Sequence, residues 1–278
     1  MSAQQVDGTA TVPGPVLELH GPAYEWSLWS TTVRVVTAEP GALRSAKRLV
    51  DDVLAHVELA ASPERADAEV ARLRGGRWVH VGATLAALVA AALALDEQGL
   101  RWPGLELDEQ ARLAQVPAGT LLDLTPVARP WAADRCAQIV AAQLDVGCLV
   151  SLGGDIATAG PPGSSADSGW EVLVQDVDGG PAAVVAVPTG LALATVAGSQ
   201  GGRWRAVTAV AADCTTARAV AAQLADGPDD PGKAVAAGVP VRAVRHDGTV
   251  ELAGGWPLDA ELGDTHGVDL EHSLPGLR

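Results

Sequence analysis

The chain has 278 residues, 48% of them hydrophobic, which is ample for one large core or two small ones. Phe is absent, Tyr occurs once and Trp eight times, so Ala, Val and Leu fill most of the interior. The formal net charge of −15 would repel phosphates, which excludes nucleic acid as a partner. An anionic substrate would need a local cluster of arginines to offset that field.

Residues 1–16 are polar and interrupted by Pro and Gly, and we expect a disordered lead. This lead has neither the basic start nor the apolar centre of a signal peptide, and the protein is predicted to be cytoplasmic. A strand is expected over Trp26–Val36, a helix over Ala42–Leu59 and a second, short helix after Ser62-Pro63.

The next segment reads as a strand, an apolar helix and a hairpin. The strand is Trp78–Val81 and contains His80, the most interesting of six histidines, although a lone histidine on a strand is also common as a structural residue. The helix Ala83–Leu95 has about 13 residues, too few to span a bilayer, so no membrane partner is expected. A hairpin is predicted over Leu105–Val116.

The most informative stretch is DLTPVARPWAADRCAQIVAAQLDVGCLVSLGGDIATA, residues 123–159. Asp123 lies where an N-cap belongs, and a helix of about four turns is expected after it. The run CLVSL has the length and composition of a buried strand. Gly153 and Gly154 let the backbone leave this strand sharply, and we expect Asp155 to be exposed at its end.

The remainder adds a Gly/Ser/Pro loop over 161–168, strands over 170–174 and 182–187, a turn over 227–232 before a closing helix and strands, and a polar tail over 261–278. Three cysteines in apolar surroundings, Cys136, Cys148 and Cys214, read as buried small hydrophobes. The fold class is therefore α+β, with mixed sheets and packed helices in one compact domain over residues 17–260.

Two blocks of the informative stretch resemble the ApbE family of flavin transferases, whose members carry a sequence close to DLxxxAKxxAxDR, then a helix and a strand ending in LGGD. The matching positions are Asp123, Leu124, Ala128, Ala132, Asp134, Arg135, Leu152, Gly153, Gly154 and Asp155. The resemblance implies the fold of this family. It also implies FAD held with its pyrophosphate on Mg²⁺, and transfer of FMN to a threonine or serine hydroxyl of an acceptor protein.

The chain departs from the family at the site of this chemistry. Where members carry metal ligands on a helix reading roughly ADxxxT, this chain has Arg218 and Ala222, a positive charge and a methyl group. A histidine segment reading HxxDPxxG and a turn reading TDGxxDP are both missing, and the family lysine is Arg129. We therefore expect no metal ligands. FAD and Mg²⁺ are expected only if the family activity is retained.

Several residues are candidates for a changed site. Asp155 and Asp134 are candidate bases, since a buried carboxylate has a raised pKa, while Asp155 could instead cap the turn. Arg218 is a candidate phosphate ligand or a solvated helix residue. Trp131 and Trp204 are candidate walls for a planar ligand or core residues. His80 is a further catalytic candidate, and Arg129, Gly153, Gly154 and Thr195 are candidate ligand-binding residues.

These features favour a repurposed, metal-independent enzyme that acts on a small aromatic or phosphorylated molecule in the old flavin cleft. An acid–base condensation or cyclisation of the Pictet–Spengler type is compatible with such a site. Two alternatives stay open: a residual FAD:protein FMN transferase with displaced ligands such as Asp213 or Thr216, and a non-catalytic flavin-binding or interaction module. The expected partner is a small molecule, and a homodimer is compatible with the sequence.

Overall fold

The computed structural model describes residues 23–96, 102–160, 169–175, 180–226 and 238–256. The expected lead, the loop over 161–168, the turn over 227–232 and the tail lie outside these residues. The helices are α1 Leu43–Ala61, α2 Ala83–Asp96, α3 Thr125–Leu144 and α4 Cys214–Asp226, with 3₁₀ turns η1 Pro40–Ala42 and η2 Glu69–Gly75. The strands are β1 Ala23–Leu28, β2 Thr31–Thr37, β3 Val79–His80, β4 Glu106–Asp108, β5 Leu113–Gln115, β6 Cys148–Leu152, β7 Asp155–Ala159, β8 Trp170–Gln175, β9 Ala182–Val187, β10 Ala192–Ala197, β11 Trp204–Ala211, β12 Val241–Arg245 and β13 Val250–Ala253.

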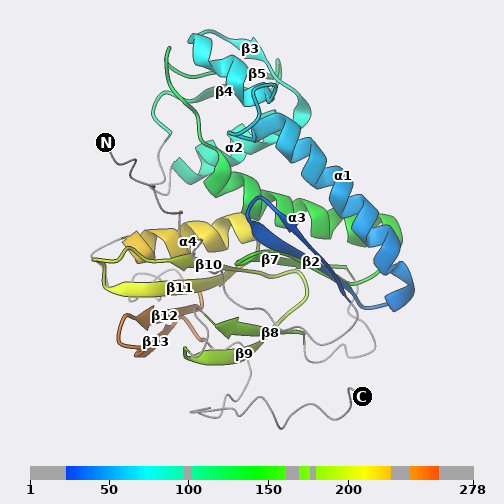
Figure 1. Cartoon of the computed structure of the whole chain (residues 1–278), viewed down its shortest axis with the longest axis vertical. Helices are drawn as coiled ribbons and strands as arrows, with labels where there is room; N and C mark the ends of the chain where they lie inside the picture. The colour runs from blue at the N-terminus through cyan, green and yellow to red at the C-terminus, as the bar shows by residue number, and fades with distance from the viewer. Residues whose placement is uncertain (1–22, 97–101, 161–168, 176–179, 227–237, 257–278) are drawn as a thin grey trace, which may run out of the picture.

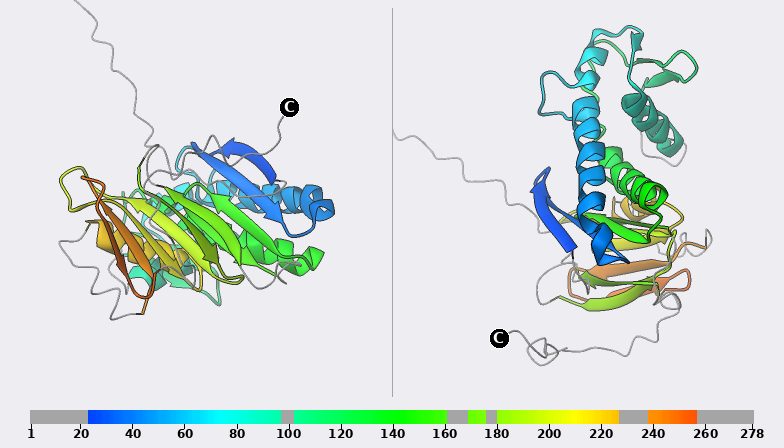
Figure 2. Two further views of the ribbon diagram at one scale, coloured as in Figure 1. Left: turned by 90° about the horizontal axis from the view of Figure 1, so that it is seen from below. Right: turned by 90° about the vertical axis from the view of Figure 1, so that its right-hand side faces the viewer.

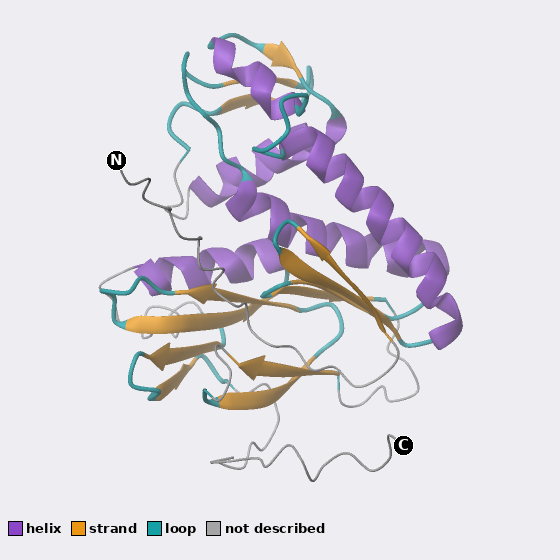
Figure 3. Ribbon diagram, viewed as in Figure 1, coloured by secondary structure: helices purple, strands orange, loops and turns teal. Residues whose placement is uncertain are grey.

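Within the described residues, the largest sheet has the antiparallel order β1-β2-β6-β7-β10-β11-β12-β13. Helices α3 and α4 cover one face of this sheet, and the β8–β9 hairpin covers the other (Figures 1 and 3). Figure 2 shows the same layers from two further directions. The α+β fold expected from the sequence is confirmed.

Strand β6 shows why the apolar run CLVSL forms a central strand. Cys148, Val150 and Leu152 belong to the core under the helices, whereas Leu149 belongs to a second core against β8 and β9. Because side chains of a strand alternate between the faces of a sheet, a strand covered on both sides needs apolar residues at consecutive positions. The second core also contains Ile156 and Leu193, from β7 and β10.

Helix α1 packs across α3, and α2 contacts α1, α3 and α4. Beyond α2 lies a small sheet of order β3-β5-β4, at the end of the molecule farthest from the β8–β9 hairpin (Figure 1). The predicted hairpin over 105–116 is confirmed as β4 and β5. Among the described residues, no helix is both long and apolar enough to cross a membrane.

Two predictions about the largest sheet are wrong. The single strand expected over Trp26–Val36 is the β1–β2 hairpin, whose two-residue turn places Trp29 and Ser30 at φ values of 50° and 55°. Turns of this kind require positive φ at both central residues and are usually marked by Asn-Gly, a signal that this sequence lacks. Asp155 is also not exposed at a strand end: it begins β7, only 1% exposed, because Gly153 and Gly154 form the turn of the β6–β7 hairpin.

Candidate functional site

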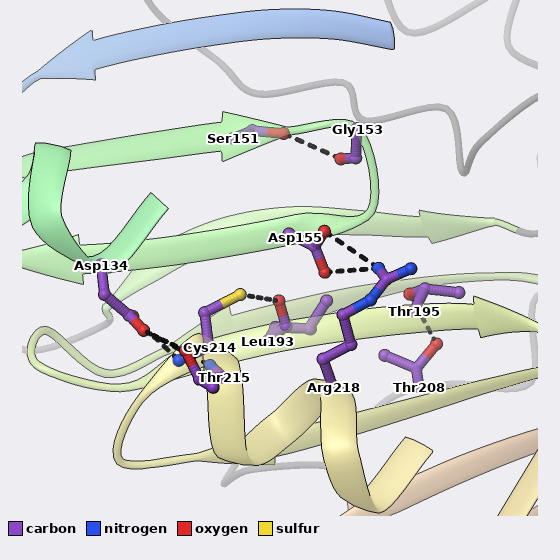
Figure 4. A network of polar contacts seen from close by, with 10 residues as sticks. All are labelled: Asp134, Ser151, Gly153, Asp155, Leu193, Thr195, Thr208, Cys214, Thr215 and Arg218. Carbon is purple, nitrogen blue, oxygen red and sulfur yellow. Dashed lines mark hydrogen bonds and ion pairs between the residues drawn. The ribbon is translucent and has the colours of Figure 1, made fainter. Parts of the chain in front are cut away.

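The site begins where the middle of α3 meets the start of α4. Asp134 of α3 accepts hydrogen bonds from the backbone N–H of Cys214 (2.8 Å) and of Thr215 (3.3 Å), and from the Thr215 hydroxyl (3.4 Å). The first N–H groups of a helix have no partner within the helix, so a carboxylate from a neighbouring element stabilises this end. Figure 4 shows Asp134 directed at the first turn of α4.

The environment of Asp134 changes its acidity. The pKa of Asp134 is raised to about 7, mainly by burial and also by the charge of Asp213, while the hydrogen bonds from Cys214 and Thr215 oppose this rise. A carboxyl group with a pKa near neutrality is present in both protonation states at physiological pH, as a general acid or base requires. The raised pKa expected for a buried carboxylate at this position agrees with the structure.

Asp134 lines a groove of about 330 Å³ between α2, α3 and the start of α4. Its apolar wall comes from α2 and from the half-buried indole of Trp131. Its polar side is formed by four more of the lining residues, Arg135, Asp213, Thr215 and Thr216. The structure therefore brings together two predicted site residues, Asp134 and Trp131, in a groove that has an aromatic wall and a titratable carboxyl group.

A second group of charges lies deeper, between β7 and α4. Nη1 of Arg218 donates to both carboxylate oxygens of Asp155, at 2.8 and 2.9 Å. The side chain of Asp155 is 1% exposed and that of Arg218 is 25% exposed. The interpretation of Arg218 as a solvated helix residue is therefore wrong, and so is the interpretation of Asp155 as a turn cap, because its carboxylate is directed at α4 (Figure 4).

Burial and charge act against each other in this pair. Burial raises the pKa of Asp155, while the positive charges of Arg218 and Arg129 oppose that rise. Burial lowers the pKa of Arg218, but the charge of Asp155 and its hydrogen bonds outweigh burial, so the pKa of Arg218 is raised. Cys214 lies close enough for Asp155 and Asp134 to raise its pKa further above the effect of burial, and it stays a thiol.

Arg129 of α3 connects this pair to the opening hairpin. Its Nη2 donates to the carbonyl oxygen of Trp29 at 2.7 Å, in the β1–β2 turn. Its Nε is buried and, within the described part of the chain, has no hydrogen-bond partner. Arg129 also lines a second groove of about 360 Å³, between that turn, the end of α1 and the start of α3.

The Gly153-Gly154 turn has a structural explanation. Gly153 has a φ of 64°, and a Cβ there would overlap Oγ1 of Thr31. Its N–H donates to the carbonyl of Thr32, and the carbonyl of Gly154 accepts from the N–H of Thr195. These bonds bring β2 and β10 to the start of β7 and so position Asp155.

Three predicted site residues lie away from these charges. Trp204 is fully buried among the side chains of β11, β12 and α4, so the prediction that it lines a ligand opening is wrong. Thr195 is hydrogen-bonded to Thr208 at 2.9 Å, and strand alternation places it with Leu193 on the face toward β8–β9 rather than toward Arg218. His80 is exposed on β3, in the small sheet at the far end of the molecule (Figure 1).

The sequence analysis missed the use of Asp213 in the groove. Its carboxylate accepts from the N–H of Thr216 at 2.7 Å and from the Thr216 hydroxyl at 2.9 Å, as an N-cap does. The pattern Asp-x-x-Thr before an apolar helix could have predicted this cap. Nothing local in the sequence indicates that Asp134, on another helix, completes the same helix start.

The residues present do not fit Mg²⁺. Arg218 and Ala222 occupy the positions at which the family resemblance implies metal ligands, and the neighbouring carboxylate of Asp155 is bonded to Arg218 through both oxygens. A hard divalent cation would meet a guanidinium group instead of free oxygen ligands.

The comparisons agree with this fold. The ApbE family model matches residues 95–201. No curated protein matches the sequence. Among solved structures, the ApbE protein of Thermotoga maritima has a TM-score of 0.69 at 20% identity, over 84% of this chain and 97% of that one. The flavin transferase ApbE of Vibrio cholerae has a TM-score of 0.67 at 16% identity, over 86% and 97%. The Pseudomonas stutzeri flavinyl transferase ApbE has a TM-score of 0.68 at 16% identity, over 86% and 96%.

Proposed function

We propose that this chain, which matches the ApbE family model over residues 95–201 and has the fold of ApbE flavin transferases, is a metal-independent enzyme that acts on a small aromatic amine. Asp134 is its acid–base residue. The observation that carries this proposal is the groove in which Asp134, with a pKa of about 7, lies beside the indole of Trp131.

The charges of the groove favour a cationic aromatic ligand. Asp134 and Asp213 contribute two carboxylates against the single guanidinium of Arg135. An ammonium group is attracted both to a carboxylate and to the face of an indole, and an aromatic ring packs against the indole and the alanines of α2. The small volume of the groove suits a ligand with one or two rings.

In the reaction, the carboxylate of Asp134 accepts a proton from the bound substrate and the resulting carboxylic acid returns it to the product or to water. In a condensation of the Pictet–Spengler type, an amine and an aldehyde lose water to form an imine, and the protonated form of Asp134 donates the proton that converts it to an iminium ion. The aromatic carbon then attacks the iminium carbon, and Asp134 takes the proton that leaves the ring. This reaction needs no oxidant, reductant or metal.

The family supplies a second candidate, FAD:protein FMN transfer, with FAD and Mg²⁺ required. The family match and the flavin transferases among the structural neighbours favour it. It predicts FAD binding that becomes tighter when Mg²⁺ is added, whereas our proposal predicts that Mg²⁺ has no effect. Calorimetric titration of FAD, with Mg²⁺ and with EDTA, separates the two, and strengthening by Mg²⁺ would overturn the metal-independent proposal.

The positive test uses tryptamine as the probe, also by calorimetry. We expect binding that tightens from pH 6 to pH 8, because Asp134 loses its proton over this range while the amine stays charged. Trp131→Leu and Asp134→Asn should each weaken binding about tenfold or more. The matched control is Trp78→Leu, which removes an indole that is 45% exposed outside the groove and should leave binding unchanged.

Absence of tryptamine binding, or equal binding by the wild type and by both groove variants, would contradict the proposal. A non-catalytic module would bind the probe but would not convert it when an aldehyde is added. Folding of each variant is checked by its far-ultraviolet circular dichroism spectrum before titration.

A further inference from the structure

At the position where the family resemblance implies a metal site, this chain has a buried ion pair between Asp155 and Arg218. The arrangement of this pair bears on which ligands the site can bind. Asp155 begins β7 and points toward the helices, on the same face as Ala157. Arg218 extends from the second turn of α4 and reaches Asp155 through a single nitrogen, Nη1. Figure 4 shows the remainder of its guanidinium group directed away from Asp155.

A guanidinium group has five N–H donors, and its planar fork matches the oxygens of a phosphate or a carboxylate. Asp155 occupies one end of the Arg218 fork. The Arg218 side chain remains 25% exposed, so part of it is accessible from solvent. The ion pair therefore leaves a partly exposed cation that is held in position by a buried anion.

Arg129 adds a second positive charge beside Asp155. Its guanidinium is fixed by the carbonyl of Trp29, and its buried Nε has no hydrogen-bond partner in the described residues. Asp155, Arg218 and Arg129 together carry a net charge of about +1, in a chain whose total is −15. Such a local excess of positive charge is what an anionic ligand needs in this protein.

We propose that Arg218, held by Asp155 and supported by the charge of Arg129, binds an anionic phosphoryl or carboxylate group directly, without a divalent cation. The inference rests on the metal-independent function proposed above. It adds a second ligand class, an anion, at a site distinct from the Asp134 groove. The guanidinium supplies both charge and hydrogen-bond donors, whereas a cation would need several oxygen ligands that this chain lacks here.

The test is calorimetric titration with inorganic pyrophosphate in the presence of EDTA, which removes divalent cations. We expect the wild type to bind pyrophosphate under these conditions. The double variant Asp155→Asn with Arg218→Gln replaces the ion pair by two amides and should lose about tenfold or more in affinity. Arg129→Met should weaken binding by a smaller factor, because it removes only the supporting charge.

The single variant Asp155→Asn provides a result of opposite sign. It raises the net charge of the site from about +1 to about +2 and frees the whole fork of Arg218, so pyrophosphate should bind several-fold more tightly than to the wild type. The control is Arg72→Met, which removes an arginine whose side chain is 56% exposed on η2, and its affinity should equal that of the wild type.

Binding that requires Mg²⁺, or equal affinity in the wild type and the double variant, would overturn the inference. Weaker binding by Asp155→Asn would also overturn it, because the affinity would then not follow the positive charge that the site presents to the anion. The tryptamine experiment uses other residues, so loss of one activity leaves the other measurable. Pyrophosphate binding without tryptamine binding would reject the proposed function alone, and the reverse would reject only the anion site.

Discussion

Asp155 and Arg218 depend on each other, because each would be an isolated buried charge without its partner. The carboxylate is 1% exposed and both of its oxygens are bonded to one guanidinium nitrogen. Removing one partner of a buried pair leaves the other desolvated and uncompensated, which costs more than removing both. The pair therefore specifies how α4 docks on β7.

We predict that Arg218→Met lowers the free energy of unfolding by about 3 kcal/mol or more at pH 7. The double variant Asp155→Asn with Arg218→Gln should lose clearly less, since two amides can still hydrogen-bond. Urea denaturation of the wild type and both variants measures this difference. Equal losses in the two variants would show that the pair is not coupled in the folded state.

Asp134 predicts a dependence of stability on pH. Its pKa is about 7 in the folded chain, against 3.8 as the ordinary value, so between these limits the folded chain binds more protons than the unfolded chain. The stability that this group contributes is complete below about pH 4 and is lost as pH rises through about 7. Asp134→Asn should remove this loss.

The measurement is the difference in unfolding free energy between the wild type and Asp134→Asn, by urea denaturation at pH 5 and at pH 7.5. The wild type should lose stability relative to the variant as the pH rises. Asp52→Asn, at an exposed position of α1, is the control and should show no such change. A constant difference at the two pH values would mean that Asp134 titrates alike in the folded and unfolded chains.

Among the elements, the β1–β2 hairpin has two adjacent residues in a strained backbone conformation. Trp29 and Ser30 both have positive φ, a conformation that costs a residue with a side chain about 1 kcal/mol relative to glycine. The turn is nevertheless held, because the Trp29 carbonyl accepts the hydrogen bond of Arg129. This contact fixes the guanidinium beside Asp155.

Ser30→Gly should therefore raise the free energy of unfolding by about 0.5–1 kcal/mol, because glycine adopts positive φ without the steric penalty. Ser27→Gly, in the middle of β1, is the matched control and should lower it by a similar amount. Thermal unfolding of the two variants gives both signs in one experiment. Destabilisation by Ser30→Gly would show that the serine side chain contributes more than the turn geometry costs.

At the scale of the whole molecule, the net charge of −15 opposes compactness, since 34 acidic residues face only 19 lysines and arginines. Raising NaCl from about 50 to about 500 mM shortens the screening length and should raise the melting temperature by about 2–4 °C at pH 7.5. Near pH 5, close to the pI of about 4.7, the same change should have little effect. An equal rise at both pH values would indicate a general salt effect instead of screening of the net charge.

The sequence alone determined the elements and the layers that follow from local pattern. The helices α1, α2 and α3, the buried strand β6 and the Gly153-Gly154 turn all come from periodicity, β-branched runs and turn residues whose effect is local. The sequence also shows where the chain departs from the ApbE pattern, because Arg218 and Ala222 at motif positions are visible in the sequence itself. The sequence did not predict the β1–β2 turn, because Trp29 and Ser30 are not the residues that usually mark such a turn.

Only the tertiary structure decided which charges meet. The pairing of Asp155 with Arg218, separated by 63 positions, and the capping of α4 by Asp134, separated from Cys214 by 80, depend on docking of α4 beside α3. The folded structure also determines which side chains are accessible. The carboxylate of Asp155, predicted to be exposed, is buried, and Trp204 lies in the core, whereas Trp131 lines a groove. Contact between distant segments and the loss of solvent around a charge are properties of the folded chain, and no local pattern contains them.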